Sequence, residues 1–326
     1  MGRPERTAME IEQFKAYFTG PGDWVEAHTS GSTGAPKPIR LSKADMRRSA
    51  RASNAFFGIG TDSHLASALA ADYIAGKMMC VRALEAGCRL TQLEVSSQVA
   101  IPDSLAPIDL LSVVPAQLPS LISRPDISHH VRQVLVGGAP APQKLLDELS
   151  ATGVKVWVSY GMTETCSHVA LARGDDPSRT FRAMPGISFS TDSDNRLIIH
   201  APDYTFGELA TNDIVDLDSP SAFRWLGRAD NAINSGGIKL FPEQLEKEYG
   251  AVLPPEAVYY VASRPSERWG SETVLVVEGS ADYADRLMSI LQTSGIDRRH
   301  LPKAVEAVAR LPRTSTGKII RKKNKT

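Results

Sequence analysis

Strand-like and helix-like segments alternate along the middle of this chain. Short apolar runs typical of strands occupy residues 64–69, 108–114, 131–138 and 154–160. Between them, helical periodicity covers residues 73–85 and 142–149. Because strands and helices that alternate in this way form a largely parallel sheet covered by helices, the predicted fold class is α/β.

The segments on either side of this alternation predict the rest of the architecture. Upstream, we expect a helix over 10–18, a strand over 25–28 and a helix over 42–57 that Ser42 caps. After about Phe181, short strands separated by turn residues predict a small β-rich subdomain.

The length of 326 residues predicts two domains. We expect a large amino-terminal domain with mixed and parallel sheets over residues 1–228, and a small mobile α+β domain over residues 229–326. The small domain would take its core from two helices and two strands, at 242–249, 257–262, 273–278 and 283–293.

Charge and cysteine content argue against several functions. Lysine plus arginine and aspartate plus glutamate number 37 each, so no overall field attracts nucleic acid or an anionic membrane. The three cysteines show no paired spacing, which argues against disulfides and zinc. The apolar stretches are short and the first residues lack a signal-peptide core. We expect a cytoplasmic protein without membrane insertion, and its oligomeric state stays open, a homodimer included.

Glycines and hydroxyl-bearing residues precede a lysine in the segment 28–37. Backbone N–H groups, hydroxyls and a lysine charge suit a polyphosphate, and the residues that would supply them are Thr29, Ser30, Gly31, Ser32, Thr33, Gly34 and Lys37. The segment is not a Walker motif, because Pro36 and Pro38 flank the lysine and prevent a helix from starting there. A flexible Ser/Gly connector is the alternative interpretation.

The predicted strand at 131–138 ends in glycine and proline, at the edge where open α/β sheets bind ligands. The backbone of Gly138, Ala139 and Pro140 could carry a flat base there, or could form an ordinary turn.

Tyr160 closes the next predicted strand, 154–160, and a polar turn follows it. The tyrosine ring could stack on a base, and Glu164 could hold Mg²⁺ after the turn formed by Gly161 and Met162. The alternative interpretation is that Thr163 and Glu164 only cap the next helix.

Three charged residues further along the chain complete the set of candidates. Asp213 follows a predicted strand end, where it could accept hydrogen bonds from a ribose, although an Asx turn is the alternative. Arg228 precedes the domain junction, and its planar fork suits a phosphate or a structural ion pair. Lys318 lies in a glycine-containing turn and could stabilise developing negative charge.

The order of these motifs resembles one family over residues 28–326. The adenylate-forming superfamily of acyl-CoA synthetases, adenylation domains and luciferases shows the same succession of Thr-Ser-Gly-Ser-Thr-Gly-Ala-Pro-Lys, Gly-Gly-Ala-Pro, Tyr-Gly-Met-Thr-Glu-Thr, Thr-Asn-Asp, Gly-Arg-Ala-Asp and Pro-Arg-Thr-Ser-Thr-Gly-Lys-Ile. Within it, residues 72–79 and 162–168 are similar to the o-succinylbenzoate–CoA ligases of menaquinone synthesis, especially their shorter bacterial forms.

The resemblance implies that most of the candidates bind ATP and Mg²⁺. The segment 29–37 would hold the β- and γ-phosphates, and Glu164 would bind Mg²⁺. Lys318 would bridge the acyl carboxylate and the α-phosphate in the first half-reaction. The remaining residues would surround the adenosine and the phosphates: Gly138, Ala139, Pro140, Tyr160, Gly161, Met162, Thr163, Asp213 and Arg228.

The resemblance also implies a pocket for a carboxylic acid. A second carboxylate on that acid needs a cation, for which Lys77 and Arg82 are alternatives. Tyr73, Ser167 and His168 would line the pocket. For His168 the alternative is a structural role, because a lone histidine is more often a satisfied core residue.

Coenzyme A would enter after the small domain rotates about a hinge at Asp230, past Gly236 and Gly237. The chain departs from the family pattern in four places. Thr211-Asn212-Asp213 stands where many relatives have Thr-Gly-Asp, and the substrate-side motif near Tyr73 lacks the histidine that the family usually has there. Only 27 residues precede His28, so we expect much of the family's first subdomain to be absent, and Lys37 is followed by proline rather than glycine or alanine.

The resemblance therefore implies an AMP-forming acid–thiol ligase. It would first form an acyl-adenylate and pyrophosphate, and then transfer the acyl group to coenzyme A. One alternative is an adenylation domain that loads an aryl or amino acid onto a carrier protein, and another is a non-catalytic nucleotide-binding protein. Because Glu164 and Lys318 are both kept, catalysis is the favoured interpretation.

Overall fold

The computed structural model describes residues 9–28, 37–105, 107–313 and 319–321. Several predicted ligand residues lie outside these ranges, so their expected roles stay predictions: Thr29, Ser30, Gly31, Ser32, Thr33, Gly34 and Lys318. Lys37 and the other predicted site residues lie inside the described ranges.

A parallel sheet forms the centre of the larger part of the molecule. Its strands follow the order β7-β6-β5-β3-β4, and each neighbouring pair runs parallel. The bounds are β3 (His64–Ser67), β4 (Arg89–Gln92), β5 (Leu110–Val113), β6 (Gln133–Val136) and β7 (Lys155–Gly161). The alternation of strands and helices in the sequence correctly predicted this parallel sheet.

The β-rich region that follows extends the same sheet. Strand β8 pairs antiparallel with β7, and five more strands continue the order as β10-β11-β12-β13-β9-β8, which gives eleven strands in all. The bounds are β8 (His168–Arg173), β9 (Thr180–Ala183), β10 (Ser188–Thr191), β11 (Arg196–Ala201), β12 (Gly207–Ser219) and β13 (Ala222–Arg228).

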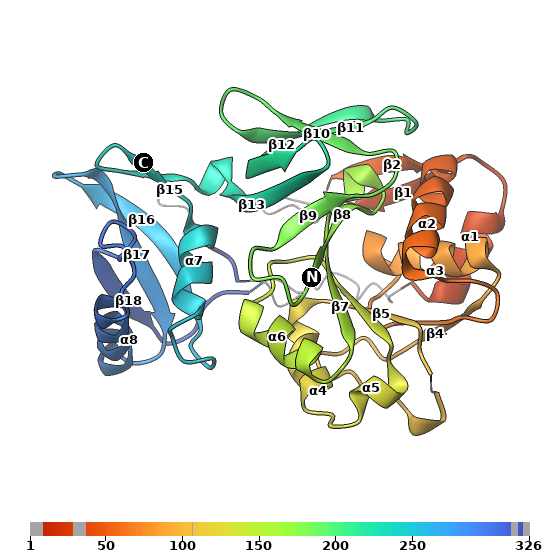
Figure 1. Cartoon of the computed structure of the whole chain (residues 1–326), viewed down its shortest axis with the longest axis horizontal. Helices are drawn as coiled ribbons and strands as arrows, with labels where there is room; N and C mark the ends of the chain where they lie inside the picture. The colour runs from red at the N-terminus through yellow and green to blue at the C-terminus, as the bar shows by residue number, and fades with distance from the viewer. Residues whose placement is uncertain (1–8, 29–36, 106, 314–318, 322–326) are drawn as a thin grey trace, which may run out of the picture.

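Helices cover the parallel strands. In Figure 1, α2 and α3 lie to the right of these strands, α6 lies to the left of β7, and α4 and α5 lie below. The expected cap of α2 is confirmed, because the Ser42 hydroxyl accepts a hydrogen bond from the Asp45 N–H. The bounds are α1 (Ile11–Thr19), α2 (Lys43–Phe57), α3 (Ile74–Ala86), α4 (Leu118–Ile122), α5 (Ile127–His130) and α6 (Gln143–Ala151), with short 3₁₀ turns at Asp103–Leu105 and Pro115–Gln117.

A hairpin, β1 (Trp24–His28) and β2 (Pro38–Ser42), carries the glycine-rich segment. The sequence predicted β1 but not β2. His28 pairs with Pro38, so the last pair of the hairpin directly flanks the segment 29–37. Proline is tolerated at the first residue of a strand because its missing N–H is not needed there.

A second sheet forms the core of the carboxyl-terminal part, at the left of Figure 1. Its elements are β14 (Ile233–Ser235), β15 (Ile238–Leu240), α7 (Pro242–Gly250), β16 (Tyr259–Ser266), β17 (Gly270–Glu278), α8 (Ala281–Thr293) and β18 (Ala304–Val308). Leu245 of α7, Leu275 of β17 and Leu287 of α8 meet in one buried cluster. A single 3₁₀ turn, Ala229–Asn231, connects the two sheets.

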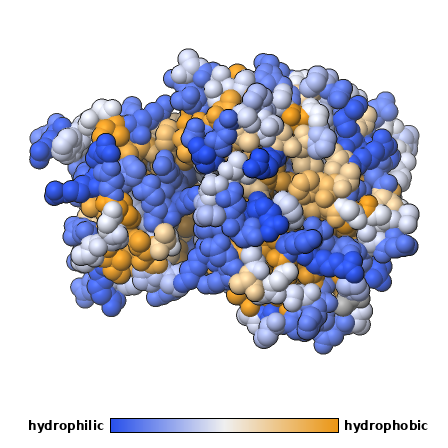
Figure 2. Space-filling view, in the orientation of Figure 1, coloured by the Kyte–Doolittle hydropathy of each residue, from blue (hydrophilic) through white to orange (hydrophobic). Residues whose placement is uncertain are grey.

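The visible surface shows no single apolar band. Hydrophilic residues cover most of the face in Figure 2, and hydrophobic ones gather in small patches. Among the described residues, no helix has the length and hydropathy needed to span a bilayer.

Candidate active site

A tight turn follows β7 and places Glu164. The Thr165 hydroxyl accepts from the Met162 N–H at 3.1 Å and lies 2.7 Å from the Ser167 carbonyl oxygen, to which it donates. A Cβ on Gly161 would lie 2.3 Å from that same carbonyl oxygen, so only glycine permits the close approach. Residues 163–165 form a 3₁₀ turn (Thr163–Thr165), and the next element is strand β8 rather than the helix that Thr163 and Glu164 would cap.

The turn ends in strained backbone at Cys166. Its φ is 63°, and the Ser167 N–H donates to the Thr165 carbonyl at 2.7 Å, which makes Cys166 the centre of a γ-turn. Such a conformation is costly for a side chain other than glycine, and it is found mostly where the surrounding structure imposes it. The turn brings Glu164 to one side of the chain and Ser167 to the other.

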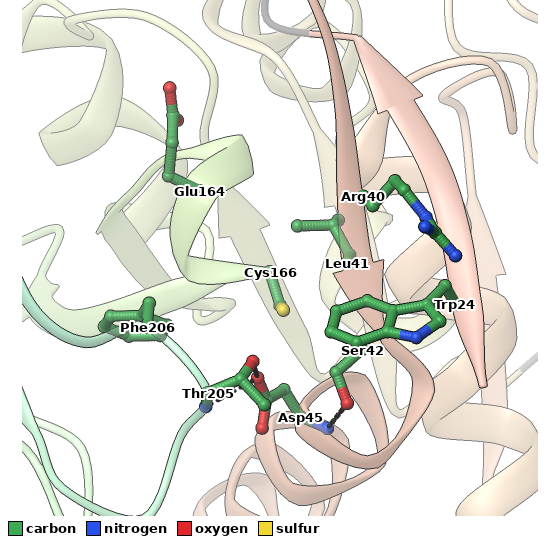
Figure 3. A pocket seen from close by; sticks show the side chains of 9 residues that line it. All are labelled: Trp24, Arg40, Leu41, Ser42, Asp45, Glu164, Cys166, Thr205 and Phe206. Carbon is green, nitrogen blue, oxygen red and sulfur yellow. Dashed lines mark hydrogen bonds between the residues drawn. The ribbon is translucent and has the colours of Figure 1, made fainter.

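A cavity of about 250 Å³ lies beside Glu164. Figure 3 shows that its lining comes from the β1–β2 hairpin, the start of α2, the 163–165 turn and the 205–206 segment: Trp24, Arg40, Leu41, Ser42, Asp45, Glu164, Cys166, Thr205 and Phe206. The Glu164 side chain points away from Asp45 in this view. Among the described residues, no hydrogen-bond or ion-pair partner is found for the Glu164 carboxylate, so its oxygens are available to a metal ion.

Asp45 is a member of this cavity that sequence reasoning missed. It is 4% exposed, and its carboxylate accepts from the backbone N–H of Thr205 at 3.0 Å and from the Thr205 hydroxyl. The sequence indicated only its position in the first turn of α2. Its partner lies 160 residues away, so only the folded chain shows that Asp45 fixes the 205–206 segment.

The predicted ribose ligand Asp213 does not lie at a strand end, so that placement is wrong. Asp213 lies inside β12, where it pairs with Arg228 of β13. The strand does not stop at Thr211, because the ladder with β13 continues as far as Ser219.

Asp213 and Tyr160 bind each other. The Tyr160 hydroxyl donates to Asp213 Oδ2 at 2.7 Å, and the Trp225 indole N–H donates to Oδ1 at 3.1 Å. Arg228 lies 3.7 Å from the same carboxylate. Burial and the neighbouring Asp213 charge hold the pKa of Tyr160 well above its ordinary value, so the hydroxyl stays a donor. Trp225 was not predicted, because nothing in the sequence distinguishes it from a core tryptophan.

Two other aromatic rings cover part of the surface of the Tyr160 ring. Its centroid lies 5.0 Å from that of Phe223 and 5.7 Å from that of Phe181. These contacts hold the ring in place at the end of β7. The predicted stacking on adenine would use the part of the ring that these two phenylalanines leave uncovered.

The 137–140 segment lies at the carboxyl end of β6, next to the end of β7. Gly138 has a φ of 83°, and a Cβ on Gly137 would lie 2.5 Å from the Ser159 hydroxyl of β7. Because β6 and β7 are parallel neighbours, Gly138, Ala139 and Pro140 share one sheet edge with the turn that carries Glu164.

Arg82 lies at the other side of this turn, in the pocket predicted for the acid. It is 2% exposed, and its guanidinium donates to Ser53 Oγ at 2.8 Å and to Ser167 Oγ at 2.7 Å. It also lies 3.3 Å from Nδ1 of His168. Burial alone lowers the pKa of Arg82 to about 10, and no carboxylate pairs with it among the described residues.

Lys77 and Tyr73, also predicted for the acid pocket, lie elsewhere on α3. The Lys77 ammonium is buried and donates to the backbone carbonyls of Ala71 and Asp72, at 2.6 and 2.9 Å, beside the Phe14 ring. Tyr73 is 46% exposed at the start of the helix. Of the two cations predicted as alternatives, the structure therefore favours Arg82.

The remaining predicted residues lie in the turn that connects the two sheets and in the small carboxyl-terminal sheet. Asp230 lies in the connecting 3₁₀ turn, 3.3 Å from Arg228. Gly236 and Gly237 form the β14–β15 turn with φ of 58° and 82°, and the Trp269 ring covers Gly236. Their predicted roles as hinge and coenzyme A contacts stay predictions.

The fold and this sheet edge define a nucleotide-binding α/β protein, and comparison with known proteins identifies its family. Residues 27–195, just over half of the chain, match the family described as AMP-binding enzyme, to which the chain therefore belongs. A solved acyl-CoA synthetase (AMP-forming)/AMP-acid ligase II-like protein from Dyadobacter fermentans is 32% identical, with 98% of this chain and 94% of that chain covered and a TM-score of 0.61.

Two further relatives are longer than this chain. A 2-succinylbenzoate–CoA ligase from Listeria monocytogenes is 28% identical over 91% of this chain and 68% of its own length. The o-succinylbenzoate CoA synthetase from Bacillus subtilis, solved with its acyl-adenylate intermediate, is 23% identical with a TM-score of 0.77, covering 91% and 67% of the two chains. The adenylate-forming fold predicted from the sequence is confirmed.

Proposed function

We propose that this chain is an AMP-forming acid–CoA ligase that converts o-succinylbenzoate to its coenzyme A thioester in menaquinone biosynthesis. Its membership of the AMP-binding enzyme family supports the reaction type, and the 2-succinylbenzoate–CoA ligases among its relatives support the acid. The observation that carries the proposal is the pair of sites on either side of the 163–168 turn: an unpaired carboxylate at Glu164 and a buried cation at Arg82.

In the first half-reaction, the acid carboxylate attacks the α-phosphorus of ATP, and pyrophosphate leaves. Such transfers depend mainly on positioning and on charge stabilisation. Asp213, oriented by Tyr160 and Trp225, would accept hydrogen bonds from the ribose hydroxyls. Lys318 would bridge the acid and the α-phosphate, a role that rests on its sequence motif.

Glu164 fits a magnesium site at the phosphates. Its carboxylate is partly exposed beside the hairpin that carries the 29–37 segment, and an oxygen ligand is what Mg²⁺ prefers. Bound Mg²⁺ would neutralise charge on the phosphates. Arg228, 3.7 Å from Asp213, would add a cation on the ribose side.

In the second half-reaction, the thiol of coenzyme A attacks the acyl-adenylate and releases AMP. We place the thiol route past Gly236 and Gly237, with rotation about Asp230, as the family resemblance implies. We further propose that the enzyme works in the cytoplasm, where all three substrates occur. Sedimentation of the purified chain would distinguish a monomer from a homodimer.

The test is ATP-dependent pyrophosphate release across a panel of acids, with and without coenzyme A. We expect 2-succinylbenzoate to exceed benzoate and medium-chain acids, and AMP and the thioester to accumulate only when coenzyme A is present. Preference for an acid without a second carboxylate would refute the proposed substrate. Transfer to a carrier-protein thiol but not to coenzyme A would favour the adenylation-domain alternative, and ATP binding without turnover would favour the non-catalytic one.

A variant separates the two half-reactions. Lys318→Ala should lose about a hundredfold or more in pyrophosphate release, as other charge-stabilising donors do. It should still convert a premade acyl-adenylate to the thioester. Lys303→Ala is the matched control, because Lys303 is an exposed lysine of the same region that donates to the backbone of Arg298. Unchanged pyrophosphate release in Lys318→Ala would remove the role assigned to Lys318.

A further inference from the structure

Hydrogen bonds hold the segment 138–140, which we expect to carry the base of ATP, at its two ends. Within the described part of the chain, the backbone of these three residues makes no hydrogen bond to other backbone groups. On the β6 side, the Gly137 N–H donates to the Val113 carbonyl at 3.1 Å. On the α6 side, the carbonyl of the buried Ala141 accepts from Arg179 Nη1 at 2.8 Å. The position of the segment therefore depends on a side chain 38 residues further along the sequence.

A second hydrogen bond joins Arg179 to the start of α6. Its Nη2 donates to Gln143 Oε1 at 2.7 Å, and the Gln143 amide donates in turn to the Gly174 carbonyl, also at 2.7 Å. Gly174 and Arg179 belong to the turn that connects β8 to β9. These two hydrogen bonds therefore run in opposite directions between that turn and the residues that follow the segment 138–140.

Arg179 adopts its position at a cost in free energy. Its φ is 50°, in the left-handed region that side chains other than glycine seldom adopt. The Asp176 carboxylate supports this turn by accepting from the N–H groups of Ser178 and Thr180, at 2.9 and 3.0 Å. Arg179 Nε is buried and has no partner among the described residues, and burial lowers the pKa of the guanidinium although the charges of Asp147 and Asp176 oppose the shift. Strained backbone and buried unpaired donors persist where the surrounding structure imposes them, and they cluster at functional sites.

We propose that Arg179 is a positioning residue for the nucleotide: by holding the Ala141 carbonyl, it fixes the backbone of residues 138–140 against which the purine base lies. The proposal rests on the proposed function, because that reaction supplies the nucleotide. Arg179 contacts the segment and not the reacting atoms, so its effect is on the binding of the nucleotide. A segment that is already ordered loses less entropy when its ligand binds, and the affinity is higher for that reason.

Two variants at position 179 separate positioning from stability. Arg179→Gly removes both hydrogen bonds of the guanidinium, but glycine suits the positive φ, so relief of backbone strain offsets part of the loss. Arg179→Lys keeps a cation that can reach either Ala141 or Gln143 but lacks the planar fork that bridges both. We measure the Kd of AMP by calorimetry, and the KM for ATP, the KM for the acid and kcat in pyrophosphate release.

We expect Arg179→Gly to raise the Kd of AMP and the KM for ATP by about tenfold, with kcat and the KM for the acid changed by less than about twofold. Arg179→Lys should lie between this variant and the wild type. An unchanged Kd of AMP in Arg179→Gly would overturn the proposal. Equal increases in the KM values of ATP and of the acid would overturn it as well, since the loss would then be a general structural one. Thermal unfolding of each variant reports stability separately.

Arg124 provides a matched control. It too donates to a backbone carbonyl, that of Ile101, and to a side chain, Asp126 at 2.9 Å, and its side chain is 22% exposed. These partners precede β6 in the chain, whereas the segment 138–140 follows it. Arg124→Ala should lower stability and leave the Kd of AMP unchanged.

The binding measurement also separates this proposal from the proposed function. If the wild type binds AMP but releases no pyrophosphate with any acid, the proposed function fails, and the Kd of AMP in Arg179→Gly still decides the role of Arg179. If the wild type does not bind AMP, the role assigned to Arg179 is wrong.

Discussion

Tyr160 and Asp213 form one hydrogen-bonded unit at the residue scale of the candidate site. They lie 53 positions apart in the sequence, yet their side chains are 2.7 Å apart. The strand order β12-β13-β9-β8-β7 brings them to one face of the sheet, and no local pattern contains that order. The residue types were therefore predictable, whereas the hydrogen bond between them was not.

Tyr160→Phe should weaken both stability and ATP binding. The change removes the donor to Asp213 and leaves a largely buried carboxylate oxygen unpaired, which costs about 1 to 3 kcal/mol. Thermal unfolding and the KM for ATP measure the two effects. Tyr259→Phe, which removes a hydroxyl that donates to the Glu246 carbonyl, should lower stability with the KM for ATP unchanged. An unchanged KM in Tyr160→Phe would contradict the ribose role of Asp213.

His168 should make the protein sensitive to acid. Its folded-state pKa lies well below the ordinary value of about 6.5, because of burial and the Arg82 charge. As the pH falls below 6.5, the unfolded chain gains a proton that the folded chain does not, so the free energy of unfolding decreases by about 1.4 kcal/mol per pH unit. Denaturant unfolding between pH 7 and pH 5 should show a shallower slope for His168→Asn. The same slope in both proteins would contradict the assigned neutral state.

At the scale of elements, patterns predicted long segments well and short ones poorly. The helices α2, α3 and α8 and the parallel strands β3, β5, β6 and β7 followed from periodicity and capping, because local sequence decides them, whereas the edge strand β4 was not predicted. Strand β2 was missed because it begins with a proline and carries the charged Arg40 at its centre. Its pairing with β1 stabilises it, which a local pattern does not record.

An ion pair anchors the carboxyl-terminal segment. Arg321 binds both carboxylate oxygens of Glu246 in α7, at 2.6 Å each, and the N–H of Leu311 donates to the Glu278 carboxylate at 2.9 Å. The side chains of Arg321 and Glu246 are 28% and 21% exposed. Leu311 and Arg321, which precede and follow the Lys318 motif in the sequence, are therefore both held by carboxylates of the small sheet and α7.

Glu246→Gln should destabilise the small sheet and slow adenylation. Loss of one partner of a buried pair costs about 3 to 5 kcal/mol, and partial exposure reduces this to about 2 kcal/mol. Pyrophosphate release should fall more than thioester formation from a premade adenylate, since Arg321 follows Lys318 by three residues in the sequence. Asp297→Asn removes the exposed partner of Arg299 and serves as control. Equal losses in the two half-reactions would show that the anchor serves stability alone.

At the scale of the whole molecule, the two sheets are joined by a short 3₁₀ turn and few contacts. Lys247 of α7 donates to the Pro177 carbonyl at 2.9 Å, and Asn231 donates to Glu243. The cluster around Leu245, Leu275 and Leu287 gives the carboxyl-terminal part a core of its own. The predicted division at residues 228 and 229 is therefore open to a direct test.

A chain of residues 229–326 alone should fold. We expect dispersed amide resonances and a single cooperative thermal transition, because its buried cluster does not draw on residues of the large sheet. A chain of residues 238–326, which lacks β14, serves as the comparison and should be less stable. Absence of a cooperative transition in 229–326 would show that the small sheet needs the large one, and the domain prediction would be wrong.

We expect the strained turn after β7 to couple the binding of the two substrates. Only Thr165 and Cys166 separate Glu164, proposed for the nucleotide, from Ser167, proposed for the acid, and the Thr165 hydroxyl is hydrogen-bonded to both Met162 and Ser167. If a ligand that orders one side also orders the other, the coupling is reciprocal: each substrate would strengthen the binding of the other by the same factor. Titration of the acid with and without a non-hydrolysable ATP analogue measures that factor directly.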